Sequence, residues 1–254
     1  MGFGFMRKKS VGADGKAVQH LTHEVAGRTL PLRIAENPRA RRLTLRIRPG
    51  AQGLTVTTPV GVPMLEVERF LFRNRDWLEE KIGTIPDRPQ VRPGIKVPIR
   101  GVNHEIVHEP GRGVTQAVRD ADGAKLIVRG EHIHLPRRVA DHLKKEAKAE
   151  IGALVEKHTK TIGRNAKSIR YKDTVSRWGS CSSEGNLSFS WRIMMAPRPV
   201  IDYLVAHEVA HLRHMNHGPK FWALCEELCP DTKRCKAWLK KNGSALQAIG
   251  FEKD

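Results

Sequence analysis

The chain has 254 residues, of which 39% are hydrophobic and 28% are charged, and this ordinary balance excludes a disordered or collagen-like chain. It is long enough for one large domain or two small ones, and it holds no apolar run of the roughly 18 residues that a membrane span needs. Lysine and arginine number 45 against 27 aspartates and glutamates, which leaves a net charge of +18. This charge favours an anionic partner, which can be a nucleic acid, a nucleotide, an acidic protein or a membrane surface, although a positive surface can also be merely solvated.

The first segment, residues 1–25, has no hydrophobic periodicity, and we expect a flexible tail there. Its basic residues are not followed by the apolar stretch of a secretory signal. Four cysteines are too few and too clustered for a disulfide framework: Cys181, Cys225, Cys229 and Cys235. Together these features predict a reducing, cytoplasmic location.

Residues 26–134 have the patterns of a β-rich region with one helix. Apolar and polar residues alternate between glycine-bearing turns, which predicts short strands in five segments: 42–48, 54–58, 95–108, 114–118 and 125–134. A Pro-Gly turn at 49–50 separates the first two strands. Apolar residues at helical spacing predict a helix over 67–82, and three prolines indicate a linker or a long loop at 84–94.

Residues 135–254 have the patterns of a mainly helical domain. Apolar residues three or four positions apart predict the longest helix over 139–162, which Gly163 closes. Further elements are expected as strands at 168–172 and 187–193, and as helices over 200–212, from Pro219 and after Asp231. The predicted fold class is therefore α+β, with a sheet-rich N-terminal half and a helical C-terminal half.

The strongest chemical signal is a cluster of histidines. Four of the 12 histidines fall within 207–217, and the segment His207-Glu208-Val209-Ala210-His211 has the HExxH form. Composition alone would produce this five-residue pattern roughly 0.04 times in such a chain. On a helix, His207 and His211 lie one above the other and can bind one metal ion, while Glu208 beside them can take a proton from metal-bound water.

A third ligand is expected from His217, ten residues after His207. On an unbroken helix His217 would lie about 15 Å further along the axis, so the helix must end soon after His211 and the chain must turn back. Asn216, Gly218 and Pro219 are the helix breakers that such a turn requires. The other candidates for the third ligand are His214, Glu226 and Glu227.

Three histidines with an open fourth position suit a catalytic zinc ion that also holds a water molecule. Imidazole also binds manganese, iron and nickel, so the identity of the metal stays open. A helix as apolar as 200–212 is expected to be buried, and buried polar groups need partners, which a metal ion would provide.

Two stretches around this motif resemble the YgjP-like zinc metallopeptidases, which are relatives of the SprT and WLM groups. They are Tyr203–Trp222, which contains the motif, and Arg177-Trp178-Gly179-Ser180-Cys181-Ser182. The resemblance is specific over about 165–240 and looser around Arg41–Arg46 and Trp77. It implies a minimal zincin-like metallohydrolase domain over 135–254, with a HExxH helix and a downstream histidine that map to His207, Glu208, His211 and His217. A metzincin-like pattern would have glycine where this chain has His214.

Three functions are compatible with these features. The first is a zinc-dependent metallopeptidase in which Glu208 assists the attack of metal-bound water on a peptide bond. The second is a metal-dependent pyrophosphohydrolase of nucleoside triphosphates such as UTP, although the chain has no Gly-rich phosphate loop. The third is a nucleic-acid-associated binding protein with a secondary metal site, whose footprint would be the basic strand Arg41–Arg48. The oligomeric state stays open.

Supporting residues are less well defined by the sequence. Arg177 is equally suited to orient a substrate carboxylate or oxyanion and to form a structural ion pair. Tyr203 lies one turn before His207, where it can donate a hydrogen bond near the metal. The strand within 186–193 is either an edge strand that pairs with an extended peptide or an ordinary core strand. Core packing is expected for His158 and for three cysteines: Cys225, Cys229 and Cys235.

Overall fold

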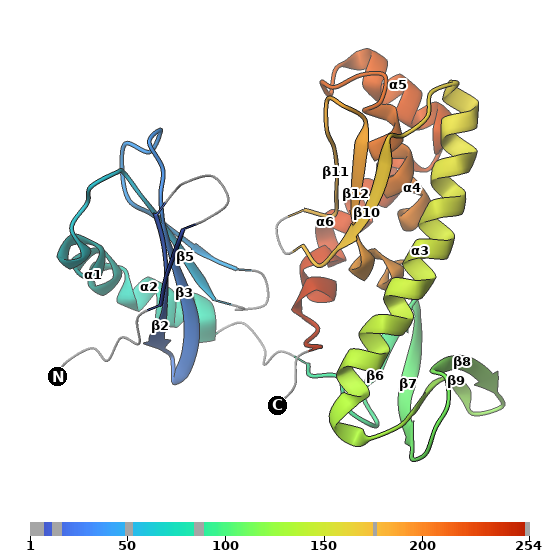
Figure 1. Cartoon of the computed structure of the whole chain (residues 1–254), viewed down its shortest axis with the longest axis horizontal. Helices are drawn as coiled ribbons and strands as arrows, with labels where there is room; N and C mark the ends of the chain where they lie inside the picture. The colour runs from blue at the N-terminus through green and yellow to red at the C-terminus, as the bar shows by residue number, and fades with distance from the viewer. Residues whose placement is uncertain (1–7, 12–16, 49–52, 84–88, 175–176, 252–254) are drawn as a thin grey trace. The chain divides into compact units, whose positions relative to one another are not determined.

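A computed structural model describes residues 8–11, 17–48, 53–83, 89–174 and 177–251 of the chain. The chain divides into an N-terminal unit, Met1–Arg88, and a C-terminal unit, Pro89–Asp254 (Figure 1). The predicted division after residue 134 is therefore wrong, and the boundary lies in the predicted proline-rich segment. The reason is packing, because Val97, Ile106 and Leu126 share one core with the long helix that follows them. Both units combine helices with sheets, so the α+β class is confirmed.

The N-terminal unit is built on a sheet with the strand order β1-β2-β3-β5-β4. Its strands are β1 (Lys8–Val11), β2 (Ala17–Val25), β3 (Arg28–Glu36), β4 (Thr44–Ile47) and β5 (Leu54–Thr58). Neighbouring strands are antiparallel except for β3 and β5, which run parallel. The predicted strands at 42–48 and 54–58 are thus present, whereas the turn predicted at 49–50 lies outside the described residues.

The flexible tail predicted for 1–25 is wrong for its described residues, because 8–11 and 17–25 are strands. Strand β2 pairs with β3 over residues 18–25, and its Leu21 and Val25 are buried in the core. The polar His23 occupies the inward position between them, which interrupts the apolar alternation that a half-buried strand normally shows. Pairing with β3, which lies further along the chain, supplies the stability that the local sequence does not indicate.

One face of this sheet is covered by two short helices, α1 (Met64–Arg73) and α2 (Arg75–Gly83), where a single helix was predicted. The break lies at Asn74, whose side-chain Nδ2 donates a hydrogen bond of 2.8 Å to the carbonyl of Phe70. Asparagine competes in this way with the backbone bonds that would continue a helix. The helices bury Val67, Leu71, Leu78 and Ile82 against the sheet.

The C-terminal unit begins with a sheet in the order β6-β7-β9-β8. Its strands are β6 (Lys96–Ile99), β7 (Val102–Glu109), β8 (Gln116–Asp120) and β9 (Gly123–Arg129), and β7 pairs in parallel with β9. A short 3-10 turn, η2 (His132–His134), leads into the long helix α3 (Leu135–Ile162). Gly163 ends α3 in the left-handed conformation with φ 62°, as its position in the sequence predicts.

A second sheet and the remaining helices complete this unit. The sheet has the order β10-β12-β11 and is followed by three helices and a 3-10 turn. The elements are β10 (Ser168–Lys172), β11 (Gly179–Cys181), β12 (Asn186–Ser190), η3 (Trp191–Met195), α4 (Arg198–Ala210), α5 (Pro219–Leu228) and α6 (Thr232–Ala248). In Figure 1 the sheet lies beside α4, and α3 runs along the unit.

The strand predicted at 187–193 ends early, and it is not at an edge of the sheet. Strand β12 stops at Ser190, and the next five residues form the buried turn η3. In the sequence, Arg192 resembles an outward-facing polar residue, which makes the strand pattern seem to continue beyond Ser190. In the structure, Arg192 is buried and donates hydrogen bonds to both carboxylate oxygens of Asp173. Since β12 lies between β10 and β11, the interpretation of this strand as a peptide-pairing edge is wrong. In the sheet that the described residues form, β11 holds an edge.

Two predictions about core residues are confirmed. His158 is buried, and its Nε2 lies 2.7 Å from the carboxylate of Asp202. The three C-terminal cysteines are buried among the apolar side chains of the C-terminal unit.

Among the described residues, no helix is both long enough and apolar enough to cross a membrane.

Candidate metal centre

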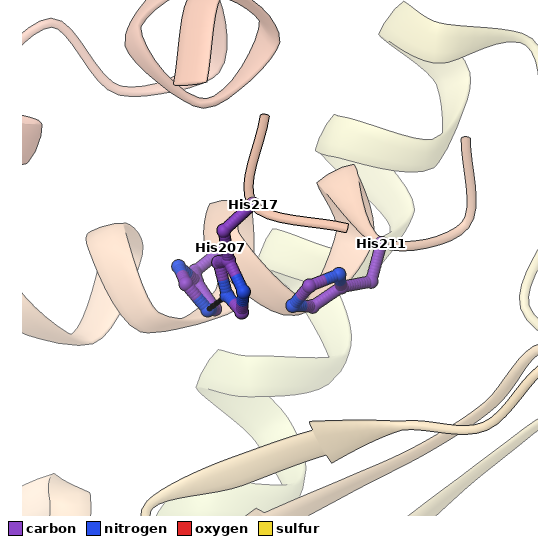
Figure 2. A group of neighbouring side chains, drawn as sticks. All are labelled: His207, His211 and His217. Atoms are coloured by element: carbon purple, nitrogen blue, oxygen red, sulfur yellow. Dashed lines mark hydrogen bonds between the residues drawn. The ribbon is translucent and has the colours of Figure 1, made fainter. Parts of the chain in front are cut away.

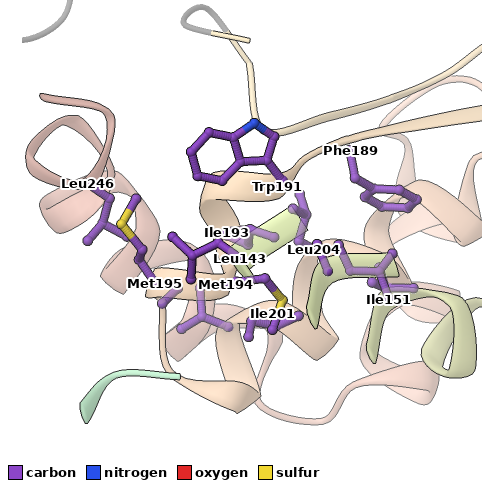
Figure 3. Packing of buried hydrophobic residues seen from close by; sticks show 14 of the residues in the cluster. Leu143, Ile151, Phe189, Trp191, Ile193, Met194, Met195, Ile201, Leu204 and Leu246 are labelled. Carbon is purple, nitrogen blue, oxygen red and sulfur yellow. The ribbon is translucent and has the colours of Figure 1, made fainter. Parts of the chain in front are cut away.

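Helix α4 presents the HExxH residues because its other faces are apolar. Ile201, Leu204 and Val205 are buried, and Figure 3 shows Ile201 and Leu204 packed beside Leu143 and Ile151 of α3. Pro199 lies in the first turn of the helix, where backbone N–H groups have no partner within the helix, so its lack of an N–H costs no hydrogen bond. This packing fixes the helix, so the direction in which His207 and His211 project is set by the core.

The chain turns back directly after this helix. Helix α4 ends at Ala210, and His211 is its C-terminal cap. The following turn brings His217 to the two earlier histidines, and one ligand nitrogen from each of the three lies within 4.8 Å of the others. The Nε2 atoms of His207 and His217 are 3.1 Å apart, and Figure 2 shows the ring of His211 directed at this pair. The turn thus has the geometry that a ligand at His217 requires.

Two of these rings are held in the neutral form that binds metals. Burial, together with the nearby His211, His217 and Lys236, lowers the pKa of His207 to about 4. Burial also lowers the pKa of His211, whose Nδ1 lies 3.1 Å from the carbonyl oxygen of His214. An Nδ1–H that donates to this carbonyl leaves Nε2 of His211 free for a cation. Three imidazole nitrogens at this spacing fit a divalent first-row metal such as zinc.

The alternative third ligands do not join this group. Among the described residues, the group of potential ligands consists of His207, His211 and His217. His214 contributes its backbone carbonyl to His211 instead of its ring. Glu226 and Glu227 lie on α5 and are not part of the group.

Glu208 lies deep in the protein beside the histidines. Its side chain is 4% exposed, and a Cβ added to Gly179 of β11 would lie only 2.5 Å from its Oε1. The carboxylate therefore packs directly against the edge strand. Burial raises the pKa of Glu208 to about 8, and the charge of Arg177 opposes part of this rise. A carboxyl group with such a pKa can both take up and release a proton near neutral pH.

An aromatic wall made by Phe221 and Trp222 of α5 holds the three rings from one side. The centroid of the buried Phe221 ring is 4.9, 4.5 and 4.7 Å from those of His207, His211 and His217 respectively. The sequence predicts a buried face for this helix, but the contact of Phe221 with all three rings is not predicted. Pro219, which begins α5 directly after the turn, is the signal that could have indicated this contact.

The supporting residues occupy different positions around the site. Tyr203 is buried, and its ring meets that of His207 edge-on with centroids 5.9 Å apart. Arg177 is exposed, and its charge acts on Glu208. Cys181 of β11 is near Glu208, and burial together with that carboxylate raises the pKa of its thiol to about 11. The thiol is therefore protonated at neutral pH and is a poor nucleophile.

Helix α4, the turn after it and the edge strand β11 bring three imidazole side chains and a buried carboxyl group together. This is the kind of site found in metal-dependent hydrolases. Comparison with protein families supports this class. The model of the YgjP-like metallopeptidase domain matches residues 41–242, and the chain therefore belongs to the YgjP-like family.

Solved structures include one protein that resembles a part of this chain. It is the metallopeptidase zymogen abylysin of Pyrococcus abyssi, known from a crystal structure. The similarity covers 36% of this chain and 93% of that chain, with 19% sequence identity and a TM-score of 0.33. No curated protein matches the sequence.

Proposed function

We propose that this protein is a zinc-dependent metallopeptidase in which Glu208 assists the attack of water on a peptide bond. The observation that carries the proposal is the convergence of three imidazole nitrogens within 4.8 Å of one another, next to a buried carboxyl group. His207, His211 and His217 would hold the metal through three ligands, which leaves a fourth position for water. Bound there, zinc would polarise the substrate carbonyl and lower the pKa of the water.

Glu208 is the proposed general base and acid. It would accept a proton from the attacking water and deliver it to the nitrogen that leaves when the peptide bond breaks. Burial supports this role, because it gives the carboxyl a high proton affinity and keeps bulk water away from the transferred proton. The contact with Gly179 holds the carboxylate in place against β11.

Strand β11 supports a peptide as the substrate. It pairs with β12 on one side, and in the sheet that the described residues form its other side is an edge. An extended peptide that added to this edge through backbone hydrogen bonds would run past Glu208. Such pairing would recognise the main chain of a substrate, and it assigns to β11 the capture role that the sequence indicated for 186–193.

Arg177 lies two residues before β11, and its charge acts on Glu208. Its exposed guanidinium would stabilise either a substrate carboxylate or the negative oxygen that develops during attack. Tyr203, by contrast, has its ring packed against His207, which supports a role in orienting this ligand.

The test is an activity assay on zinc-loaded protein with casein-derived peptides and, separately, with nucleoside triphosphates. We expect the wild type to cleave peptides, and Glu208→Gln to retain zinc but lose at least about a hundredfold in rate, the range typical of general base catalysis. Glu227→Gln, an exposed change on α5, is the matched control and should keep full activity. Pyrophosphate release without peptide cleavage would replace the proposal with the phosphoanhydride reaction, and full activity of Glu208→Gln would remove Glu208 from the mechanism.

A further inference from the structure

The sheet of the N-terminal unit carries a row of histidine, arginine and threonine side chains across four strands. The strand register places His20 of β2 opposite Arg33 of β3. On the other side of β3, Arg33 lies opposite Thr55 of β5, and Thr55 lies opposite Arg46 of β4. Residues directly opposite one another project from the same face of a sheet. We call these four residues the arginine row.

The arginine row lies on the face that α1 and α2 do not cover. Leu32 and Leu54 immediately precede Arg33 and Thr55, and both leucines are buried in the core beneath the helices. Because successive side chains of a strand point to opposite faces, Arg33 and Thr55 point away from that core. Arg33 and Arg46 are accordingly exposed.

The charge of the row is not neutralised within the described residues. Neither Arg33 nor Arg46 forms an ion pair or a hydrogen bond with another described side chain. Arginines on the helices differ in this respect, because Arg69 and Arg75 pair with glutamates of their own helices. The adjoining row of the same face, Ala35–Thr57–Thr44, contains no acidic residue either. An anion that approached this face would meet two free guanidinium groups.

More arginines precede the edge strand of this sheet. Arg39, Arg41 and Arg42 lie in the exposed segment between β3 and β4, and Arg46 follows within β4. The segment from Arg33 to Arg46 thus contains five arginines and one acidic residue, Glu36. Glu36 accepts a hydrogen bond from the backbone N–H of Gly61, so its carboxylate is engaged elsewhere. The positive potential is therefore concentrated on one sheet face and on the approach to its edge strand.

We propose that the arginine row binds the sugar-phosphate backbone of a nucleic acid. The planar guanidinium groups of Arg33 and Arg46 match a phosphate group with two parallel hydrogen bonds each. The two arginines are two strand spacings apart, about 10 Å, and Thr55 between them offers a hydroxyl to a further phosphate oxygen. Because the row has no phenylalanine, tyrosine or tryptophan ring and its two guanidinium groups are matched to phosphates, binding is expected to be largely independent of base sequence.

The chemistry of the face favours a nucleic acid over other anionic partners. A membrane-binding surface needs exposed apolar side chains that enter the lipid. The arginine row and its adjoining row expose none, because Val18, which lies opposite Ala35, is only 6% exposed. A stable protein interface needs a buried anchor of large side chains, which the threonine and alanine side chains of these two rows do not provide. Binding to phosphates draws its free energy from the release of counterions and requires neither feature.

The test is fluorescence anisotropy with labelled DNA of about 20 nucleotides, single-stranded and duplex, between about 50 and 200 mM salt. For the double variant Arg33→Gln/Arg46→Gln we expect roughly tenfold weaker binding, together with a loss of about 1.4 to 1.8 in the slope of log K against log salt. The matched control is Arg69→Gln/Arg73→Gln on α1, which removes the same charge from exposed positions of a helix that covers the opposite face. The control should bind like the wild type.

Three outcomes would overturn the proposal. Equal weakening of both double variants would show that binding depends on net charge alone. Unchanged binding by Arg33→Gln/Arg46→Gln, or equally tight binding of phosphatidylserine vesicles or polyglutamate, would contradict it as well. Unfolding of each variant in urea verifies that the fold is intact. The result does not depend on the proposed peptidase activity, because the four substituted arginines are not part of the metal centre. They are Arg33, Arg46, Arg69 and Arg73.

Discussion

Glu208 provides the sharpest test of how burial shapes the site, through the stability of the protein without metal. In the folded protein its pKa is raised to about 8, whereas in the unfolded chain it has the ordinary value of 4.5. The folded state therefore holds a proton that the unfolded state has released, and wild-type stability falls as the pH rises from 4.5 towards 8. Glu208→Gln has no such proton and should not show this loss.

The size of the effect follows from the shift. Each pKa unit corresponds to 1.36 kcal/mol, so a shift of 3.5 units costs the wild type roughly 5 kcal/mol once the pH is well above 8. At pH 7 the folded carboxyl is still mostly protonated, and the loss relative to pH 4 is roughly 3 kcal/mol. With a side chain that is 4% exposed, solvent screening reduces these figures little.

The assay is urea unfolding of chelator-treated wild type and Glu208→Gln at pH 5, 7 and 9. The difference between the two free energies of unfolding is the useful quantity, because the titration of all other groups cancels in it. We expect Glu208→Gln to gain stability relative to the wild type with each step in pH. Glu227→Gln, at an exposed position, should give a difference that does not change with pH. Parallel curves for wild type and Glu208→Gln would refute the argument that burial sets this pKa.

Three further predictions concern other positions. Gly179→Ala places a methyl group 2.5 Å from Oε1 of Glu208, so the carboxylate must move. Steady-state rates should then show about a hundredfold loss of peptidase activity, and elemental analysis should show an unchanged metal content. His217→Ala should weaken zinc binding by more than about a hundredfold in a competition titration, whereas His214→Ala should stay within a few-fold because it keeps its backbone carbonyl. Gly152→Ala, in a helix with space for the methyl group, should stabilise the protein by about 0.5–1 kcal/mol in urea unfolding and leave activity unchanged. Loss of zinc in Gly179→Ala, equal affinities of the two histidine variants, or destabilisation by Gly152→Ala would contradict the respective arguments.

Features that depend on a few neighbouring residues are predicted well by this sequence. Helix α3 and its left-handed end at Gly163 follow from apolar spacing and a single glycine, both of which act within one or two helical turns. The same holds for His207 and His211, because residues four apart on a helix always share a face. The turn that returns His217 is predicted for a similar reason, since the breakers around it act on the local backbone.

Features that depend on distant parts of the chain are predicted poorly. Arg192 looks like a solvent-facing strand residue until Asp173 is known to lie beside it. The placement of β12 in the middle of its sheet, with β11 at an edge, is likewise a property of strand order, which local periodicity does not contain.

The sequence by itself determined the chemistry that is available at the metal centre, because the HExxH pattern and the helix breakers after it act through local backbone geometry. Only the tertiary structure decided the conditions under which this chemistry operates. Packing of α4 in the core buries Glu208 and raises its pKa, Gly179 of a separate strand supports the carboxylate, and Phe221 of α5 contacts all three imidazoles. The physical reason is that burial and electrostatic environment arise from side chains that are distant in sequence and meet only in the folded chain.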